Sequence, residues 1–220
     1  MSNYLQKQIG RLFSASPDIL FGYADVSYSP LSTEYKSALV FAVPYGKQLT
    51  LADYTEAGFE EGIQIAKTRL EAKIAEIEAV LKENEVKYYI PPVAQKNETD
   101  LLAEFSFKFA AVNAGLGWIG KNDVLITERY GPRVRLSAVL IDHEFPCGTP
   151  VTESKCGDCH LCVDVCPYKA LSGETWNINS RRNDIIDYQL CNERRSFFIP
   201  KLGRKSSCGL CLAVCPYGTE

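Results

Sequence analysis

Eight of the nine cysteines in this chain lie at or beyond residue 156, with a spacing that can hold iron. The first run reads C-x2-C-x2-C-x3-C-P and consists of Cys156, Cys159, Cys162 and Cys166. The second run reads C-x2-C-x3-C-P and consists of Cys208, Cys211 and Cys215. Runs of this kind bind 4Fe–4S clusters in two-cluster ferredoxins, where the last cysteine of a run ligates the other cluster. The spacing therefore predicts two 4Fe–4S clusters and a role in electron transfer.

The crossed arrangement divides the cysteines between the two clusters. Cluster I is expected to use Cys156, Cys159, Cys162 and Cys215. Cluster II is expected to use Cys166, Cys208 and Cys211, together with a fourth ligand. A symmetric second run would place that ligand at position 205, where the chain has Lys205, so we assign Cys191, the nearest spare thiol. Cys147 is left over, and a lone cysteine in a Pro/Gly-rich loop is most often a bystander.

Zinc and disulfides are the rival uses of clustered cysteines. Zinc sites use C-x2-C pairs, but they rarely contain three cysteines in a C-x2-C-x2-C run that is followed by Cys-Pro. Disulfides suit small secreted domains, and the opening MSNYLQKQIGRLF lacks the apolar core of a signal peptide. No apolar stretch reaches transmembrane length, so we expect no membrane partner. We therefore expect a reducing, cytoplasmic location.

The charge balance does not favour a nucleic-acid partner. The net charge is −3 and the isoelectric point is about 5.6. A basic run lies between positions 181 and 205, and such a run can bind phosphate. We favour instead a solvated loop that covers the clusters and tunes their potential.

Upstream of the cysteines the chain alternates between strand-like and helix-like stretches. Continuous or alternating apolar runs predict strands at 38–45, 86–90, 123–127 and 133–141. Apolar residues at three- and four-residue steps predict a long helix from about 59 to 84, and a second helix is expected from about 100 to 114. This order predicts an α/β (α+β) fold with a mixed sheet. The Pro/Gly-bearing stretch FPCGTPVTESK is the expected linker between a cofactor domain, 1–150, and a cluster domain, 151–220.

The segment AGLGWIGKN, at 114–122, is the most informative part of the upstream domain. Its three glycines permit close backbone approach, Trp118 offers an aromatic face, and Lys121 and Asn122 offer a charge and an amide. A ligand-binding loop is one interpretation. The other is that Gly115 is the left-handed C′ residue of the preceding helix, with Leu116 as its hydrophobic contact.

The order of these motifs resembles the epoxyqueuosine reductase family, which is related to reductive dehalogenases. The resemblance rests on AGLGWIGKN, the first cysteine run, a lone cysteine and the second run, and it spans roughly residues 95–217. It implies a nitroreductase-like, cobalamin-processing-like domain upstream of a ferredoxin-like module. It also supports Cys191 as a ligand of cluster II. The corrin neighbours that it implies are Gly115, Gly117, Trp118, Gly120, Lys121 and Asn122.

The same resemblance implies a mechanism. Two 4Fe–4S clusters, fed by a ferredoxin- or flavodoxin-type donor, pass electrons to a base-off cobalamin, which reduces a small molecule or modified nucleoside. Asp100, in ETDLLAEF, is near the position of the family's proton donor, but the Ala-Pro of that motif is missing and the spacing is one residue longer. We favour an N-cap or first-turn role for this carboxylate over the catalytic one. The chain ends five residues after Cys215, so we expect a short member without the helical-repeat domain that grips tRNA, and a tRNA partner is doubtful. The alternative is an electron-transfer, corrinoid-reducing or cobalamin-processing protein without substrate chemistry of its own, acting on a corrinoid protein.

Overall fold

The structure is a computed structural model that describes residues 2–46, 49–93, 102–203 and 205–219. Two compact units organise the chain, and each is assembled from separate stretches of sequence. Unit 1 comprises residues 1–44, 66–116 and 135–150, and unit 2 comprises residues 45–65, 117–134 and 151–220. One boundary falls at the expected linker, but 45–65 and 117–134 join the cysteine-rich segment. The division into domains 1–150 and 151–220 stays a prediction.

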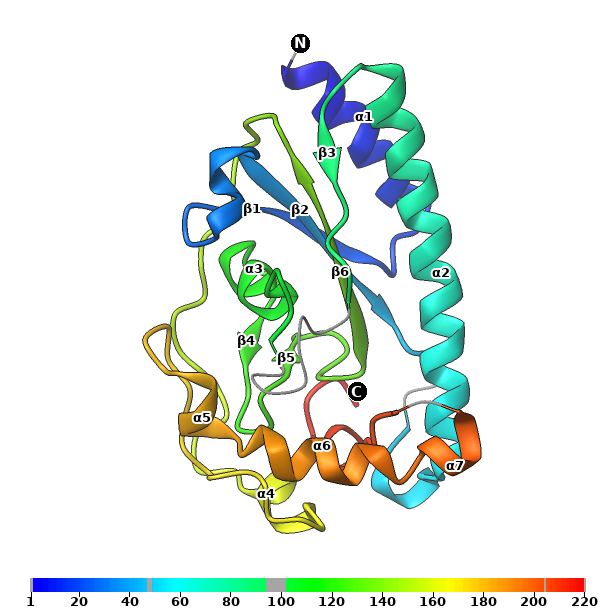
Figure 1. Ribbon diagram of the computed structural model, residues 1–220, viewed down its shortest axis with the longest axis vertical. Helices are drawn as coiled ribbons and strands as arrows, with labels where there is room; N and C mark the ends of the chain where they lie inside the picture. The colour runs from blue at the N-terminus through cyan, green and yellow to red at the C-terminus, as the bar shows by residue number, and fades with distance from the viewer. Residues whose placement is uncertain (1, 47–48, 94–101, 204, 220) are drawn as a thin grey trace. The chain divides into compact units, whose positions relative to one another are not determined.

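Unit 1 is built on a four-stranded sheet with the order β1-β2-β6-β3 (Figure 1). Its strands are β1 (Leu20–Asp25), β2 (Ser37–Pro44), β3 (Tyr88–Tyr89) and β6 (Val134–Ile141). The β1–β2 and β3–β6 pairs are antiparallel. Lys36 N donates to Ile141 O and Tyr45 N donates to Arg133 O, so the start of β2 lies beside the end of β6, and this pair is antiparallel too. The expected α/β class is confirmed, but the sheet is antiparallel and not mixed.

Helices cover both faces of this sheet. Phe13 of α1 (Ser2–Ser14) stacks on Phe21 of β1 with ring centroids 4.0 Å apart. The next residue, Gly22, faces the end of α3 (Phe107–Asn113), where an added Cβ would lie 2.9 Å from Ala114 O. Because successive residues of a strand point to opposite faces, α1 and α3 lie on opposite sides of β1.

The long helix α2 (Glu56–Glu83) and strand β2 confirm the clearest sequence predictions. Every residue of β2 is buried, as its unbroken apolar run predicts. The second predicted helix was partly wrong, because α3 begins only at Phe107. Ser106 is its N-cap, with the side-chain oxygen accepting from Phe109 N, and the preceding described residues, 102–105, are not helical.

Unit 2 carries a two-stranded antiparallel sheet of β4 (Trp118–Ile119) and β5 (Leu125–Ile126). The predicted strand 123–127 contains β5, which pairs with β4. Short helices follow at α4 (Leu161–Val165), α5 (Arg182–Ile185), α6 (Tyr188–Ser196), α7 (Ile199–Leu202) and α8 (Leu210–Ala213). Short 3-10 turns lie at Pro30–Thr33 and Leu51–Asp53. None of the helices within the described ranges is both long and apolar enough to cross a bilayer.

Candidate iron–sulfur site

Four thiols from both cysteine runs surround one cavity in unit 2. This first thiol group consists of Cys156, Cys159, Cys162 and Cys215. The cavity is completed by the apolar side chains of Ile126, Leu161, Pro216 and Tyr217 and by Lys121 and Asn122. Helix α4 begins directly after the first loop, and α8 leads into Cys215. The structure thus gathers the residues expected around cluster I, although their role as ligands stays a prediction.

A second thiol group gathers beside the first and consists of Cys166, Cys191, Cys208 and Cys211. Cys166, Cys191 and Cys211 pack against Ala170, Leu171 and Ile186. Cys208 lies close enough to Cys191 and Cys211 to raise the pKa of both thiols. Cys191 comes from α6, between the two runs in sequence, and the fold brings it beside Cys166, Cys208 and Cys211; its role as a ligand stays a prediction.

The chemistry of this donor set fits iron–sulfur clusters. Burial and the neighbouring thiols raise the pKa of Cys162 to about 12 and that of Cys191 to about 11. Burial also raises the pKa of Cys215, opposed by a Tyr217 backbone hydrogen bond and by Arg133. Crowded, buried thiols become thiolates readily only when positive charge arrives, so cluster binding would release protons.

The arrangement of the first thiol group around a cavity suits a cluster. A mononuclear zinc site needs four donors, with sulfur about 2.3 Å from a single ion. The first thiol group instead lines a cavity. In a 4Fe–4S cluster each of the four thiolates binds a different iron, so donors spread around a space are what it needs.

Arg133 holds the tail that carries Cys215, and the sequence did not single it out. Its side chain is 1% exposed, and Nη1 donates to Leu212 O at 2.9 Å and to Cys215 O at 3.0 Å. Nη2 donates to Tyr217 O. A buried guanidinium that bonds three carbonyls satisfies the last turn of α8 and fixes the loop after it. Nothing in the sequence distinguishes Arg133 from Arg135, two residues on in the same apolar stretch.

The glycines of AGLGWIGKN make close contacts within the chain. Gly115 has a φ of +76°, Gly115 N donates to Val112 O and Leu116 N donates to Ala111 O. These bonds form a Schellman motif, so Gly115 is the C′ residue of α3. At Gly117 an added Cβ would lie 2.0 Å from Ile126 O, and at Gly120 it would lie 2.3 Å from Ile126 Cδ1. Both glycines therefore allow β4 and β5 to pack closely.

The other three of the six expected corrin neighbours, Trp118, Lys121 and Asn122, are buried in unit 2. Trp118 is 1% exposed, packs against Cys215 and lies 4.9 Å from Tyr217 between ring centroids. Asn122 Nδ2 donates to Cys211 O at 3.2 Å, which ties the β4–β5 turn to the second cysteine run. Lys121 lines the cavity of the first thiol group. The corrin contacts expected of the six residues stay a prediction.

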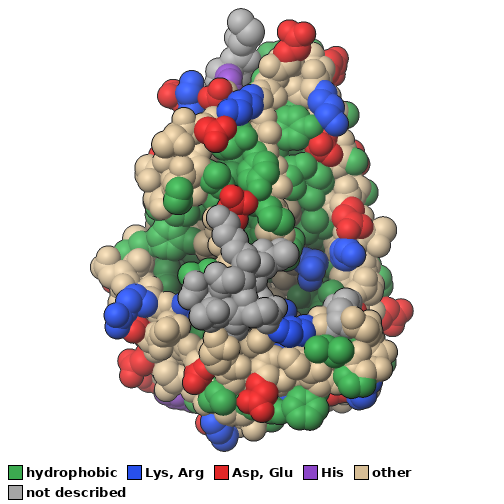
Figure 2. Space-filling view, in the orientation of Figure 1, with side chains coloured by type: hydrophobic (Ala, Val, Ile, Leu, Met, Phe, Trp, Pro, Cys, Tyr) green, Lys and Arg blue, Asp and Glu red, His purple; other side chains and the backbone are tan. Residues whose placement is uncertain are grey.

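The segment that carries Cys191 is anchored to the first turns of α2. Glu56 accepts from Arg194 and from Lys201, both at 3.0 Å, and Glu60 accepts from Ser206 Oγ at 2.6 Å. Phe197 is 57% exposed, and Figure 2 shows hydrophobic side chains at the surface over α7. This part of unit 2 is thus held largely by polar contacts near the surface.

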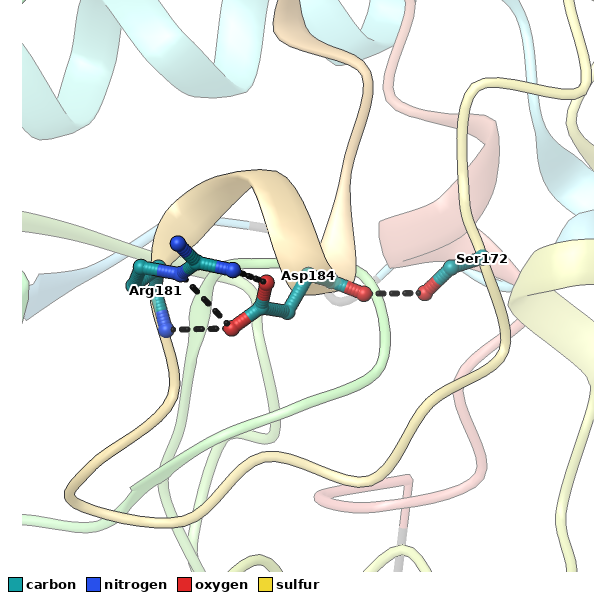
Figure 3. Close-up of polar contacts among 3 residues, drawn as sticks. All are labelled: Ser172, Arg181 and Asp184. Atoms are coloured by element: carbon teal, nitrogen blue, oxygen red, sulfur yellow. Dashed lines mark hydrogen bonds and ion pairs between the residues drawn. The ribbon is translucent and has the colours of Figure 1, made fainter.

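A second polar anchor holds the connection between Cys166 and Cys191. Asp184 in α5 accepts from Arg181 N at 2.9 Å and from Arg181 Nη2 at 3.1 Å, and its carbonyl accepts from Ser172 Oγ at 2.8 Å (Figure 3). The hydrogen bonds from Arg181 lower the pKa of the Asp184 carboxyl. Together these bonds close the loop that presents α6.

Two sequence-predicted positions fall elsewhere. Asp100 lies outside the described residues. Cys147 is exposed in unit 1 and lines a separate cavity of about 380 Å³ with Asp25, Lys36 and Glu144. It is the one cysteine of the nine that joins neither thiol group.

Comparison with known proteins agrees with this site. The family described as a 4Fe-4S double cluster binding domain matches residues 155–218. An epoxyqueuosine reductase of Listeria monocytogenes is 31% identical over 196 residues, which are 84% of this chain and 48% of that enzyme. The epoxyqueuosine reductase of Bacillus anthracis is 29% identical over 189 residues, with 82% and 48% covered. The chain therefore spans about half the length of the curated relatives that it matches.

Solved structures share the fold. The crystal structure of a selenomethionine-labelled epoxyqueuosine reductase matches with a TM-score of 0.63 and 19% identity, over 99% of this chain and 66% of that one. A catabolic reductive dehalogenase in complex with 3-bromo-4-hydroxybenzoic acid matches with a TM-score of 0.69 and 20% identity, over 96% of this chain and 31% of that one. The expected fold and the double-cluster module are confirmed. The chain belongs to the epoxyqueuosine reductase family.

Proposed function

We propose that the chain is an iron–sulfur reductase in which two 4Fe–4S clusters pass electrons to a cobalamin for reduction of a small molecule or modified nucleoside. The observation that carries this proposal is the gathering of eight thiols into two adjoining groups, within a segment that matches a double-cluster family. The first thiol group would hold cluster I. The second, completed by Cys191, would hold cluster II.

The chain's own residues would position the clusters and exclude water from them. When bound, the clusters supply one-electron transfer at low potential. The thiols hold them, and Arg133 and Asn122 fix the loops that carry Cys215 and Cys211. Ile126 and Tyr217 close the cavity of the first group. A dry surrounding of this kind strengthens every charge interaction with the clusters.

The cobalamin and the substrate class come from the relatives. One reductive dehalogenase structure is described with a mechanism for B12-dependent dehalogenation, and one epoxyqueuosine reductase structure contains an epoxyqueuosine-modified tRNA stem loop. We propose Asp100 as the proton donor and a ferredoxin- or flavodoxin-type protein as the electron donor, acting in the cytoplasm where thiols stay reduced. A modified nucleoside, free or within a tRNA stem loop, is the substrate to be tested first.

A second function is favoured by one observation. The segment expected to face a corrin is packed within the chain itself, with Trp118 and Asn122 almost fully buried. A protein that only relays electrons to a corrinoid partner would need no corrin cradle of its own. This alternative keeps both clusters and removes the substrate step.

Anaerobic reconstitution followed by cobalamin titration separates these functions. We expect about eight irons per chain, because each cluster contains four. A change in the cobalamin spectrum on titration, followed by turnover of the stem loop with a low-potential reductant, supports the reductase. Eight irons without a cobalamin response leaves electron relay. Zinc in place of iron overturns both.

A further inference from the structure

Lys121 is a buried cation in the wall of the cavity that the first thiol group surrounds. Its residue is 3% exposed, and it lines the cavity together with all four thiols. The β4–β5 turn holds its backbone, because Gly120 N donates to Val124 O and Asp123 N donates to Gly120 O. The neighbouring Asn122 ties the same turn to Cys211 O. The turn fixes the backbone of Lys121, and burial confines its side chain, so that the ammonium is held beside the expected site of cluster I.

No carboxylate balances this charge within the described part of the chain. The polar contact of Lys121 Nζ there is with His160 Nε2, at 3.4 Å. By contrast the buried Lys73 pairs with Glu76 at 2.5 Å. A buried ammonium is costly unless an opposite charge compensates it. The groups that line this cavity with Lys121 and can become anionic are the four thiols of the first group.

A bound 4Fe–4S cluster would supply that negative charge, and more of it when reduced. Four thiolates leave the cluster anionic in both oxidation states, and each added electron makes it more negative by one charge. A fixed cation in a poorly hydrated site therefore stabilises the reduced cluster more than the oxidised one. The cation beside the second thiol group differs from Lys121, because Arg195 is only half-buried and donates to Tyr188 Oη at 2.7 Å.

We propose that Lys121 is an electrostatic tuning residue that raises the reduction potential of cluster I above that of cluster II. The proposal rests on the two clusters of the proposed function. One electron leaves reduced cluster II, which is oxidised, and enters cluster I, which is reduced; no bond forms or breaks. Lys121 thereby favours electron transfer from cluster II to cluster I, so that cluster I is the electron acceptor.

Redox titration of the reconstituted full chain, followed by electron paramagnetic resonance, tests this role. In Lys121→Gln we expect the ratio of reduced to oxidised cluster I at a given potential to fall about tenfold, a midpoint about 59 mV lower. Lys121→Arg keeps the charge and should stay close to wild type. Repeating the titration in a Cys191→Ser background isolates the signal of cluster I.

Lys155 is the matched control. It lies next to Cys156, and its Nζ is 5.1 Å from the centroid of the Trp118 ring, but its side chain is 55% exposed. Water screens such a charge, so Lys155→Gln should change the ratio less than twofold. Equal midpoints in Lys121→Gln and Lys155→Gln, with about eight irons in both, overturn the proposal.

Two further outcomes also decide the question. Lys121→Met removes the charge without leaving a polar group buried, and it should lower the midpoint as Lys121→Gln does. If both neutral variants load no cluster I while Lys121→Arg loads it fully, the charge serves assembly and the tuning role is overturned. Absence of clusters from the wild-type chain would instead overturn the proposed function, so the two failures are distinguishable.

Discussion

The two thiol groups are built in contrasting ways. Three thiols of the first group come from one continuous stretch, the loop with Cys156 and Cys159 and the start of α4 with Cys162, and the fourth is brought to them by a tail that the buried Arg133 holds. The second group is drawn from three separate stretches of sequence, around 166, 191 and 208–211. Its α6–α7 segment is held by ion pairs to Glu56, whose side chain is 35% exposed. One site is fixed from the interior and the other from the surface.

This difference predicts different responses to solvent. Hydrogen bonds from a buried guanidinium to carbonyls are shielded from salt, whereas exposed ion pairs contribute little and are screened. Local opening is therefore expected to begin at α6–α7 and to expose the second thiol group first. Variants at each site test this difference between the two thiol groups.

The largest effect is expected from Cys191→Ser. Because the second group has no other spare thiol nearby, cluster II should be lost and the iron content should fall from about eight to about four per chain. Iron analysis and absorbance after anaerobic reconstitution measure this. Cys147→Ser, which alters the cysteine outside both groups, should keep the full content. Unchanged iron in Cys191→Ser would exclude this thiol as a ligand.

Arg133→Met should destabilise the first site from within. The change removes three hydrogen bonds and leaves the carbonyls of Leu212, Cys215 and Tyr217 without this donor. We expect the free energy of unfolding, measured in urea, to fall by about 3 kcal/mol. Hydrogen bonds from a charged donor contribute about 1.5–3 kcal/mol each, and water replaces some of them in the variant. Arg135→Met, two residues farther along and within β6, should change the free energy by less than about 0.5 kcal/mol. Equal effects of the two variants would mean that the hydrogen bonds from Arg133 contribute nothing specific to the free energy of unfolding.

Gly209→Ala should weaken the second site through the backbone. Gly209 lies between Cys208 and Cys211 with a φ of +74°, and an added Cβ would lie 2.5 Å from the buried Phe59 ring. Left-handed strain costs about 1–3 kcal/mol, so iron of cluster II should be released to a chelator faster than iron of cluster I. Gly203 has a φ of +67° with open space around it. Gly203→Ala therefore introduces backbone strain without a steric clash, and it is the control for the clash at Gly209. Stable loading in Gly209→Ala would argue against this loop as part of the site.

Glu56→Gln should give a smaller, salt-dependent effect. It breaks the pairs with Arg194 and Lys201, which together are expected to contribute about 0.5 kcal/mol. Release of iron from cluster II should quicken at low ionic strength, and the difference from wild type should vanish near 1 M salt. Glu71→Gln, which breaks the pair with Lys67 farther along α2, is the control and should leave iron release unchanged.

The smallest effect concerns Asp184. Hydrogen bonds from Arg181 lower the pKa of this exposed carboxyl in the folded state. Its contribution is therefore present above the ordinary carboxyl pKa of 3.8 and is lost as the pH falls through the lower folded value. Amide hydrogen exchange across α5 should show protection that Asp184→Asn reduces at pH 6 and no longer changes at the acid limit. A pH-independent difference would contradict this linkage.

The elements that sequence patterns predicted are those whose signal is long or unbroken. Strand β2 and helix α2 carry apolar residues in a continuous or periodic pattern, so burial alone selects their conformation. Helix α1 and strand β4 were not predicted, and β5 is a shorter strand than the predicted 123–127. Strand β4 has only two residues, and its pairing depends on Gly117 meeting Ile126 O across a turn. Such a contact exists only after the chain has folded.

The cysteine spacing alone predicts two iron–sulfur clusters, because ligand number and loop length are local properties of the chain. It also indicated the need for Cys191, through the lysine at position 205. Only the tertiary structure decided what surrounds each thiol group. Arg133 and Lys121 lie in the interior because the segment before β6 and the β4–β5 turn carry them there, and burial strengthens the interactions of their charges, which water would otherwise screen.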